Sequence, residues 1–349
     1  MDIVALNELI PNIVDEIMLY FAFHPDLPSE DIGKKNIATL SQFLQKKHSL
    51  DNTSHVKQLV FLCESLCEMT PLFCLRRDTQ LGYQNRYYWA GAFAGGEYYA
   101  KMSYEDRKPF FTMWENAIFG SRYIYNKYKE YVLPIIYTAH DESEGIGTGF
   151  VVANQFIVTA RHCLEKAKSI SFGKIAYDVY KDAEVFYHTN PNIDIAIVHI
   201  KPLGKSGFML SEDCAIFDKV ITMGYPKIPG FNCFRTAEEA VISAVPEKRF
   251  TVTEGQVAAE SQQIWSRENL FLITAKIKGG NSGGPVVNQF GDCIGIVSNT
   301  PFADGGDYDD LGYGTVMPAS FAISMIADSS SCQPDPSVRF VQYPYDNDN

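Results

Sequence analysis

The chain of 349 residues contains no apolar run long enough to cross a membrane and no excess of basic residues. A membrane-spanning helix needs about 20 consecutive apolar residues, so we expect no membrane as a partner. Lys and Arg total 30 against 42 Asp and Glu, which gives a formal net charge of −12. Because nucleic-acid binding depends on a basic surface, we expect no nucleic acid as a partner either.

The first residues also lack the basic and apolar regions of a secretory signal. The chain has eight cysteines, an even number that would permit disulfides, but without such a signal reduced thiols are favoured. Cys63 and Cys67 lie one helical turn apart, and no cluster of metal-ligand spacing accompanies them. We therefore expect a cytoplasmic protein with neither a metal nor a cofactor.

The hydrophobic spacing changes near residue 131. Up to about residue 75, apolar residues recur at three- and four-residue steps, which is typical of helices. Residues 76–131 are rich in aromatic side chains, which serve either a core or a partner-binding surface. From residue 132, short apolar runs between turns are typical of a β-sandwich or barrel, and residues 320–327 have the pattern of a closing helix.

These patterns predict an α+β multidomain protein. We expect a helical, aromatic-rich N-terminal domain at residues 1–130 and a β-domain at residues 131–328. The polar residues 329–349, interrupted by prolines, are predicted to form a mobile tail.

A serine flanked by glycines on both sides, at residues 278–285, dominates the second half of the chain. Glycine is used where the backbone turns tightly or approaches a ligand. Such a turn would present the Ser282 hydroxyl and direct the amides of Gly280 and Ser282 at one point. Two converging amides are what an oxyanion requires, although the motif alone also permits a glycine-rich turn with an idle serine.

A serine hydroxyl is a weak nucleophile and needs a base that is oriented by a carboxylate. His162 follows an apolar run, and Asp194 opens another. The order His162, Asp194, Ser282 matches the chymotrypsin order and excludes the subtilisin and α/β-hydrolase orders. Asp178 and Asp182 compete for the role of the aspartate, but we interpret both as solvated turn residues.

Residues from about 132 to 327 resemble the chymotrypsin/trypsin-like serine peptidases, and in particular their bacterial trypsin-like and HtrA-like branch. The resemblance lies in five stretches: residues 147–152, 159–163, 194–197, 224–226 and 280–285. It implies a double β-barrel of two six-stranded barrels, with His162, Asp194 and Ser282 as the catalytic triad. The amides of Gly280 and Ser282 would then form the oxyanion hole. Residues 1–130 lie outside the resemblance.

Three departures from the family pattern carry information. Asn281 stands where zymogen-activated members have an aspartate, so we expect activity that needs no cleavage between the two halves. Cys163 lacks a pairing cysteine earlier in the barrel, which fits a reducing compartment. No PDZ-like domain follows the barrel, which leaves regulation to residues 1–130.

The resemblance also suggests residues that contact substrate. Lys276 stands where trypsin-like members have the floor of the primary pocket, and Ser298 ends the strand that pairs with the substrate backbone. Asn299 and Thr300 follow at the pocket entrance. An acidic stretch at residues 304–310 comes next, and a solvated loop is our interpretation of it.

The leading prediction is an intracellular serine endopeptidase acting on a protein or peptide substrate. Residues 1–130 would bind a regulatory protein or recruit the enzyme, in a bacterial stress or defence pathway. An interaction module with a latent or inactive protease fold is the alternative. Esterase activity on small acyl esters is a third possibility, since the same groups perform both reactions.

Overall fold

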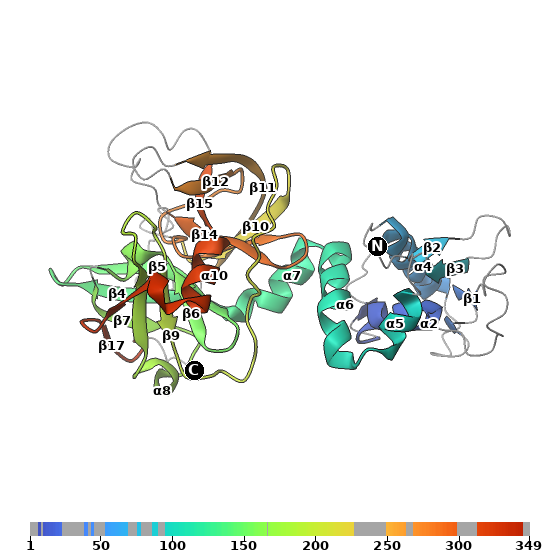
Figure 1. Cartoon of the computed structure of the whole chain (residues 1–349), viewed down its shortest axis with the longest axis horizontal. Coiled ribbons are helices and arrows are strands. Elements are labelled where there is room, and N and C mark those ends of the chain that lie inside the picture. Colours follow the sequence, from blue (N-terminus) through green and yellow to red (C-terminus); the bar gives the residue numbers. More distant parts are fainter. Residues whose placement is uncertain are drawn as a thin grey trace, which may run out of the picture. The chain divides into compact units, whose positions relative to one another are not determined.

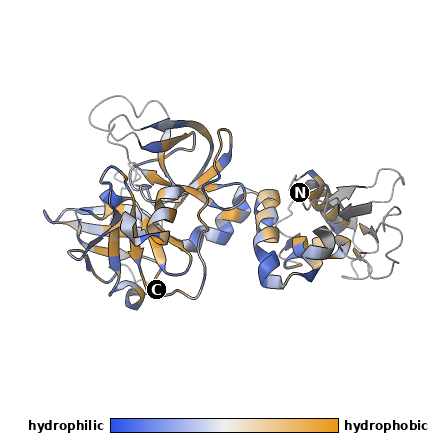
Figure 2. Ribbon diagram, viewed as in Figure 1, coloured by the Kyte–Doolittle hydropathy of each residue, from blue (hydrophilic) through white to orange (hydrophobic). Residues whose placement is uncertain are grey.

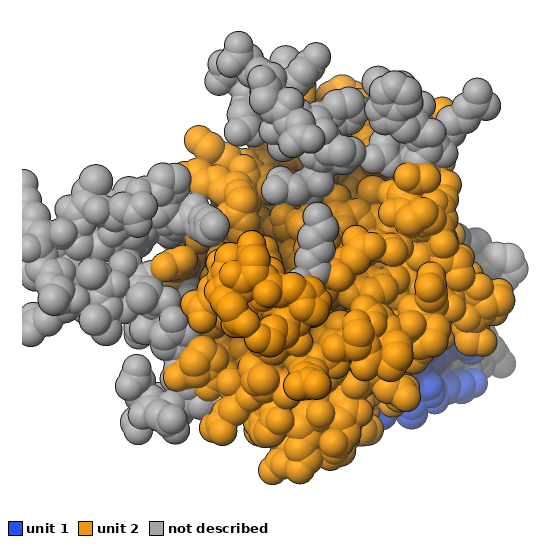
Figure 3. All heavy atoms as spheres, turned by 90° about the vertical axis from the view of Figure 1, so that its left-hand side faces the viewer, with its two compact units in different colours: residues 1–123 blue, residues 124–349 orange. Residues whose placement is uncertain are grey.

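A computed structural model of the chain describes residues 6–7, 10–22, 38–40, 43–44, 53–68, 75–77, 86–89, 95–165, 167–226, 249–262, 268–298 and 313–344. The chain divides into two compact units, Met1–Tyr123 and Ile124–Asn349, which Figure 3 distinguishes by colour. The division lies seven residues before the predicted one. The reason is that Ile124 is buried in a hydrophobic cluster of the second unit, with Val132 and Phe150.

The first unit is built mainly from helices (Figure 1). They are α2 (Ile13–Ala22), α4 (Thr53–Glu68), α5 (Gly95–Lys101) and α6 (Tyr104–Phe119). A small sheet that the sequence did not predict accompanies them, with the order β1-β3-β2: β1 (Ala38–Thr39), β2 (Leu75–Arg77) and β3 (Arg86–Trp89). The periodic residues Leu6, Ile10, Val14, Ile17, Met18 and Phe21 are all buried, as the helical spacing predicted.

A buried ion pair joins α2 to the helices that follow it in the chain. The Asp15 carboxylate is 4% exposed and accepts hydrogen bonds from Arg107 Nε at 3.0 Å and Nη2 at 3.1 Å. The Tyr99 hydroxyl donates to the same carboxylate at 2.8 Å. A buried charge is tolerated only when it is paired and hydrogen-bonded, so these contacts tie α2 to α5 and α6.

Helix α6 begins before Pro109, which lies inside the helix. The Ser103 side chain accepts a hydrogen bond from the Asp106 amide and caps the N-terminus, which supplies the start signal. Gly120, with a φ of 73°, ends α6 before α7 (Ser121–Tyr128) begins.

The second unit contains two β-sheets. The first has eight strands in the order β16-β8-β9-β6-β5-β4-β7-β17, and the second is a closed barrel in the order β10-β11-β12-β15-β14-β13. The strands of the first sheet are β4 (Val132–Ala139), β5 (Glu144–Val152), β6 (Phe156–Thr159), β7 (Ala167–Phe172), β8 (Glu184–His188), β9 (Ala196–His199), β16 (Cys332–Asp335) and β17 (Arg339–Phe340). Those of the barrel are β10 (Lys219–Gly224), β11 (Thr251–Gln262), β12 (Asn269–Ile273), β13 (Pro285–Asn288), β14 (Cys293–Ser298) and β15 (Gly314–Pro318).

This architecture agrees with the predicted double barrel. The six strands β4 to β9 form the body of the first sheet, and the closed barrel has the six strands expected of the second. Helix α10 (Ala319–Ala327) follows β15, which confirms the closing helix. Hydrophobic residues run along the strands of both sheets (Figure 2), and their buried side chains form the cores of this unit.

Residues 329–344, which follow α10, do not form the mobile tail that we predicted. Strand β16 pairs antiparallel with β8, and β17 pairs parallel with β7. The hydroxyls of Tyr177 and Tyr180 donate to the carbonyls of Phe340 and Val341 at 3.2 and 3.1 Å. The C-terminal segment is therefore part of the first sheet, because its backbone groups pair at both edges of that sheet.

Tyr343, which is 2% exposed, provides a test of this attachment. We expect Tyr343→Ala to lower the free energy of unfolding of the second unit by about 3 to 5 kcal/mol, as for other buried aromatic truncations. Val341 is 41% exposed, so Val341→Ala is the matched control, with an effect within about 0.5 kcal/mol. Thermal unfolding of both variants measures the difference, and equal midpoints would show that the segment does not stabilise the fold.

Candidate functional site

His162 and Asp194 meet at the end of the first sheet. His162 lies in the 3-10 turn η2 (Arg161–Cys163) directly after β6, and Asp194 lies just before β9. Asp194 Oδ2 is 2.8 Å from His162 Nδ1, and Asp194 Oδ1 accepts a hydrogen bond from the His162 amide at 3.0 Å. One carboxylate thus holds both the ring and the backbone of the histidine.

Ser298, at the end of β14, supplies a third hydrogen bond to this carboxylate. Its hydroxyl donates to Asp194 Oδ2 at 2.5 Å, and the residue is 3% exposed. We expected Ser298 to contact substrate, whereas the structure directs its side chain to Asp194. A carboxylate with three donors is fixed in position.

The protonation of His162 reflects opposing effects. Burial lowers the pKa of the ring, but the hydrogen bonds to Asp194 and to the Cys163 thiol raise it by more, so that the net shift is upward. The histidine side chain is 39% exposed, and water reduces electrostatic shifts at such a site. With Nδ1–H directed to Asp194, Nε2 is the ring nitrogen that remains to accept a proton.

The competing aspartates have other partners. Asp178 pairs with Lys181 at 2.7 Å, and Asp182 pairs with Lys201 at 3.1 Å. Both carboxylates are exposed, with 83% and 67% of their side-chain surface accessible. Both carboxylates are thus solvated as we predicted, and Asp182 lies in a turn, but Asp178 lies in the short helix α8 (Tyr177–Tyr180).

The loop of Ser282 lies between β12 and β13 and is held at several points. The Gly283 amide donates to the Val297 carbonyl at 2.7 Å, and the Gly284 amide donates to the Asn281 carbonyl at 2.8 Å. The Ser282 carbonyl accepts from the Thr148 amide at 2.9 Å. Since Thr148 belongs to β5, this bond joins the serine loop of the barrel to the sheet that carries His162.

Gly283 shows why the motif needs glycine at this position. Its φ is 84°, in the left-handed region that disfavours other residues. A Cβ atom added here would lie 2.2 Å from both Thr148 O and Thr159 Oγ1. These are backbone and buried side-chain atoms, which have no room to move.

We therefore expect Gly283→Ala to destabilise the second unit by at least about 2 kcal/mol, from left-handed strain and overpacking together. Gly279→Ala is the matched control for stability, because no atom lies within 4 Å of its added Cβ. Differential scanning calorimetry of the two variants tests this prediction. A Gly283→Ala variant with the wild-type midpoint would contradict the packing described above.

The amides predicted to bind an oxyanion have no partner in the part of the chain that the structure describes. Neither the Gly280 nor the Ser282 amide donates to a protein acceptor there, although neighbouring amides in the loop do. Gly280 has a φ of 97°, and its carbonyl accepts from Thr148 Oγ1 at 2.8 Å. Two uncommitted amides next to a serine are compatible with the binding of a developing negative charge.

The segment that contains His162 contacts the segment that contains Ser282 through Cys163. Cys163 follows His162, and its thiol lies 3.7 Å from the Ser282 carbonyl. A Cβ built at Gly147 would lie 2.8 Å from Cys163 Sγ and 3.7 Å from the same carbonyl. Among the described residues, the Ser282 hydroxyl has no hydrogen bond, including to His162. Such contacts are often long in unliganded enzymes and shorten when substrate binds.

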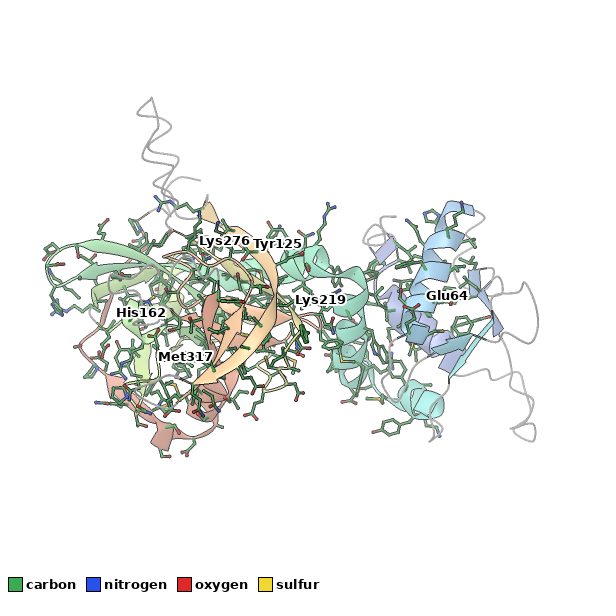
Figure 4. The ribbon with its side chains drawn as sticks, turned by 90° about the horizontal axis from the view of Figure 1, so that it is seen from above. Glu64, Tyr125, His162, Lys219, Lys276 and Met317 are labelled. Carbon is green, nitrogen blue, oxygen red and sulfur yellow. The ribbon has the colours of Figure 1, made fainter. Side chains whose placement is uncertain are left out.

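The other predicted substrate contacts are placed differently. Lys276, labelled with His162 in Figure 4, has an exposed side chain, and its carbonyl accepts from Thr253 Oγ1 at 2.9 Å. Nothing in these contacts gives Lys276 the role of a pocket floor. Asn299 and Thr300 lie outside the described residues, and so does the acidic stretch at 304–310.

Ile277 is the residue near Lys276 that sequence reasoning missed. A Cβ at Gly314 would lie 2.1 Å from Ile277 Cδ1 and 3.2 Å from Ile273 Cγ1. Gly314 begins β15, in which the next residue, Thr315, pairs with Ser298. The isoleucine side chain thus occupies the space in front of Gly314, close to the end of β14. Its apolar character next to Lys276 was the signal that the sequence offered.

The remaining sequence predictions concern cysteines, metals and membranes. The six cysteines within the described residues, Cys63, Cys67, Cys163, Cys214, Cys293 and Cys332, are free. Over the same ranges, no three His, Cys, Asp or Glu side chains gather as a metal site requires. None of the helices that the structure describes has the length and apolar composition to cross a membrane.

Comparison with known proteins bears on this site. Residues 147–296 match the family described as the trypsin-like peptidase domain, and this segment contains His162, Asp194 and Ser282. The magnetosome formation protease MamE of Paramagnetospirillum magneticum is 30% identical over 192 residues, which are 53% of this chain and 24% of that protein. A probable periplasmic serine endoprotease, DegP-like, of Chlamydia muridarum is 30% identical over 184 residues, 52% of this chain and 33% of that protein.

Among solved structures, the active form of the Rv3671c protease from M. tuberculosis aligns with a TM-score of 0.45 and 21% identity. The alignment covers 62% of this chain and 88% of that one. The chain spans no more than a third of the length of the two curated relatives. None of these alignments reaches two thirds of this chain.

Proposed function

The chain carries a trypsin-like peptidase domain, and we propose that this domain is a serine endopeptidase whose triad is His162, Asp194 and Ser282. The observation that carries the proposal is the pair of hydrogen bonds that Asp194 accepts from the ring and the amide of His162. Cys163, the residue after His162, has a thiol that contacts the Ser282 carbonyl. This is the arrangement by which a carboxylate orients a histidine base next to a serine.

In the proposed mechanism, Ser282 Oγ attacks the carbonyl carbon of a peptide bond while His162 Nε2 takes the hydroxyl proton. Asp194 keeps Nδ1 protonated and stabilises the imidazolium. The amides of Gly280 and Ser282 bind the oxygen that becomes negative. His162 then gives its proton to the leaving amine, and an acyl-enzyme remains on Ser282. In the second half of the reaction, water takes the place of Ser282 as the nucleophile and hydrolyses this acyl-enzyme by the same steps.

The test of this function is hydrolysis of an unfolded protein and of fluorogenic peptides by the purified chain. Cleavage within the polypeptide, inhibited by a serine-directed fluorophosphonate, supports an endopeptidase. Faster turnover of small acyl esters with no cleavage of matched amides would instead favour an esterase.

A latent enzyme is a second candidate, favoured by the absence of a Ser282–His162 hydrogen bond among the described residues. In that case the chain acts as an interaction module until a partner aligns the site. Activity of the chain alone excludes latency. Activity that appears only after addition of cell extract supports it.

We further propose that the primary pocket accepts small aliphatic side chains. Ile277 fills the space before Gly314, and the position that the family resemblance gives to the pocket floor is Lys276, not the aspartate that binds Arg or Lys. We expect kcat/KM for cleavage after Val or Ala to exceed that after Arg by at least about tenfold, the effect of about 1.4 kcal/mol. A peptide series differing only at this residue measures the ratio. A preference for Arg would contradict the proposal.

The first unit is proposed to recruit or regulate the enzyme by binding a protein. Its buried core consists of residues between Leu6 and Phe119 and is separate from the cores of the second unit. Phe61, Tyr98 and Tyr104 are exposed on it, and exposed aromatic side chains favour protein interfaces. Comparing fluorophosphonate labelling of the full chain with that of residues 121–349, which keep α7 whole, shows whether this unit changes reactivity.

A cytoplasmic location and a role in a bacterial stress or defence pathway remain predictions. The free cysteines fit a reducing compartment, whereas one relative named above is called periplasmic. Cell fractionation with the native chain decides between the two compartments.

A further inference from the structure

Each polar atom of Thr148, in β5, forms a hydrogen bond with the serine loop or with a segment next to it. Its amide donates to the Ser282 carbonyl at 2.9 Å, and its hydroxyl donates to the Gly280 carbonyl at 2.8 Å. The hydroxyl also accepts from the Tyr225 amide at 3.0 Å. The Thr148 carbonyl accepts from Thr159 Oγ1 at 2.7 Å.

These bonds connect the parts of the unit that hold the proposed triad. Thr148 pairs with Pro134 in the first sheet, whereas Gly280 and Ser282 belong to the loop of the second barrel. Thr159 ends β6, three residues before His162. Thr148 therefore fixes Ser282 to the same strands that place His162, and it is fully buried.

The hydroxyl of Thr148 acts on the part of the loop that has the least rigidity of its own. Gly279 and Gly280 precede Ser282, and glycine populates many backbone conformations at similar energy. A hydrogen bond to the Gly280 carbonyl restricts the rotation of this segment. The Asn281 amide, which donates to the Lys278 carbonyl at 3.0 Å, is the other restraint on the same turn.

We propose that Thr148 is a positioning residue that holds the Gly280 and Ser282 amides in the conformation that binds the oxyanion. The inference rests on the proposed peptidase function. Thr148 does not touch the reacting atoms, and it acts through the Gly280 and Ser282 carbonyls. Tyr225 supports it from the second barrel, where its amide donates to the Thr148 hydroxyl and its own hydroxyl donates to the Val132 carbonyl at 3.0 Å.

Two substitutions separate the hydroxyl from the packing of the side chain. The Thr148 methyl group lies 3.4 Å from a Cβ built at Gly284, so the side chain also fills space. Thr148→Val keeps this shape and removes the hydroxyl, while Thr148→Ser keeps the hydroxyl and removes the methyl. Thr222→Val is the matched control, since the hydroxyl of Thr222 is buried in β10 and bonds to Thr253.

We expect Thr148→Val to lower kcat by about tenfold to a hundredfold, the scale of a misplaced catalytic group, with KM within about twofold. Affinity for a peptide boronate, whose tetrahedral adduct presents an oxyanion, should fall by the same factor. Thr148→Ser and Thr222→Val should stay near wild type. The inference is overturned if Thr148→Val retains full kcat, or if Thr148→Ser is as slow as Thr148→Val.

Amide hydrogen exchange distinguishes failure of this inference from failure of the proposed function. If Thr148 holds the loop, peptides covering residues 277–285 exchange faster in Thr148→Val and at the wild-type rate in Thr148→Ser. This result needs no turnover. A wild-type chain without activity would therefore remove the proposed function, while unchanged exchange in Thr148→Val would remove the role of Thr148.

Discussion

Replacing Ser282 with alanine is expected to lower kcat for peptide hydrolysis by about a millionfold, the scale measured for loss of a triad serine in another serine protease. The physical reason is that the variant lacks the oxygen that attacks the carbonyl carbon, while the buried Cys163 thiol next to His162 is directed at the Ser282 carbonyl. The substitution removes one oxygen atom from a residue that is 4% exposed, so the fold should be retained. Steady-state kinetics on a fluorogenic peptide measure the effect.

Ser171 is the matched control for this experiment. It is also buried, at 1% exposure, but lies in β7 of the first sheet. Ser171→Ala should leave kcat within about twofold of wild type, because β5 and β4 separate β7 from β6, the strand that precedes His162. Substantial turnover by a carefully purified Ser282→Ala variant would show that another residue is the nucleophile.

Replacing Asp194 with asparagine is expected to lower kcat by about ten-thousandfold. The amide cannot accept the Nδ1 proton as the carboxylate does, so the histidine adopts the wrong tautomer. It also removes the hydrogen-bond acceptor that raises the pKa of His162. The base must be unprotonated to act, so the residual activity should appear at lower pH than in the wild type, because the histidine loses its proton at lower pH.

A pH profile of kcat/KM for wild type and Asp194→Asn tests both statements. Asp182→Asn is the control, because Asp182 is exposed and pairs with Lys201. Its rate and profile should match the wild type. An Asp194→Asn enzyme with wild-type kcat, or with its acidic limb moved to higher pH, would contradict the assigned role of the carboxylate.

The sequence was most informative where chemistry restricts residue choice. Gly283 shows why: with a φ of 84° and no room for a Cβ, this turn admits only glycine, so the motif is visible without a structure. The same holds for the helical face of α2, whose buried residues recur at regular steps. The predictions drawn from these patterns describe the fold of the described residues well.

The sequence was least informative where pairing between distant segments decides the structure. Strand β11 has partly exposed residues along most of its length, so its pattern of alternation was too weak to predict a strand. The segment that forms β16 contains Pro334, which pairs at the edge of the sheet opposite Phe186. Proline is tolerated at sheet edges, yet in the sequence it suggested a tail.

Side-chain direction was the other feature that the sequence did not determine. The place of Ser298 in β14 suggested a contact with the substrate backbone, but it did not show that the Ser298 hydroxyl bonds to Asp194. Lys276 was assigned to the pocket floor, but its side chain is exposed and Ile277 faces Gly314 instead. Alternation along a chain shows that neighbours point to opposite sides, and only the three-dimensional structure shows which side meets the site.

The most direct test of the central claim is the intact mass of the chain after incubation with a fluorophosphonate, which reacts with an activated serine. Wild type and Ser282→Ala are compared under the same conditions. The structure predicts a single adduct on the wild type and none on the variant. An adduct on both proteins would place the reactive serine elsewhere. No adduct on either protein would contradict a competent site in the chain alone.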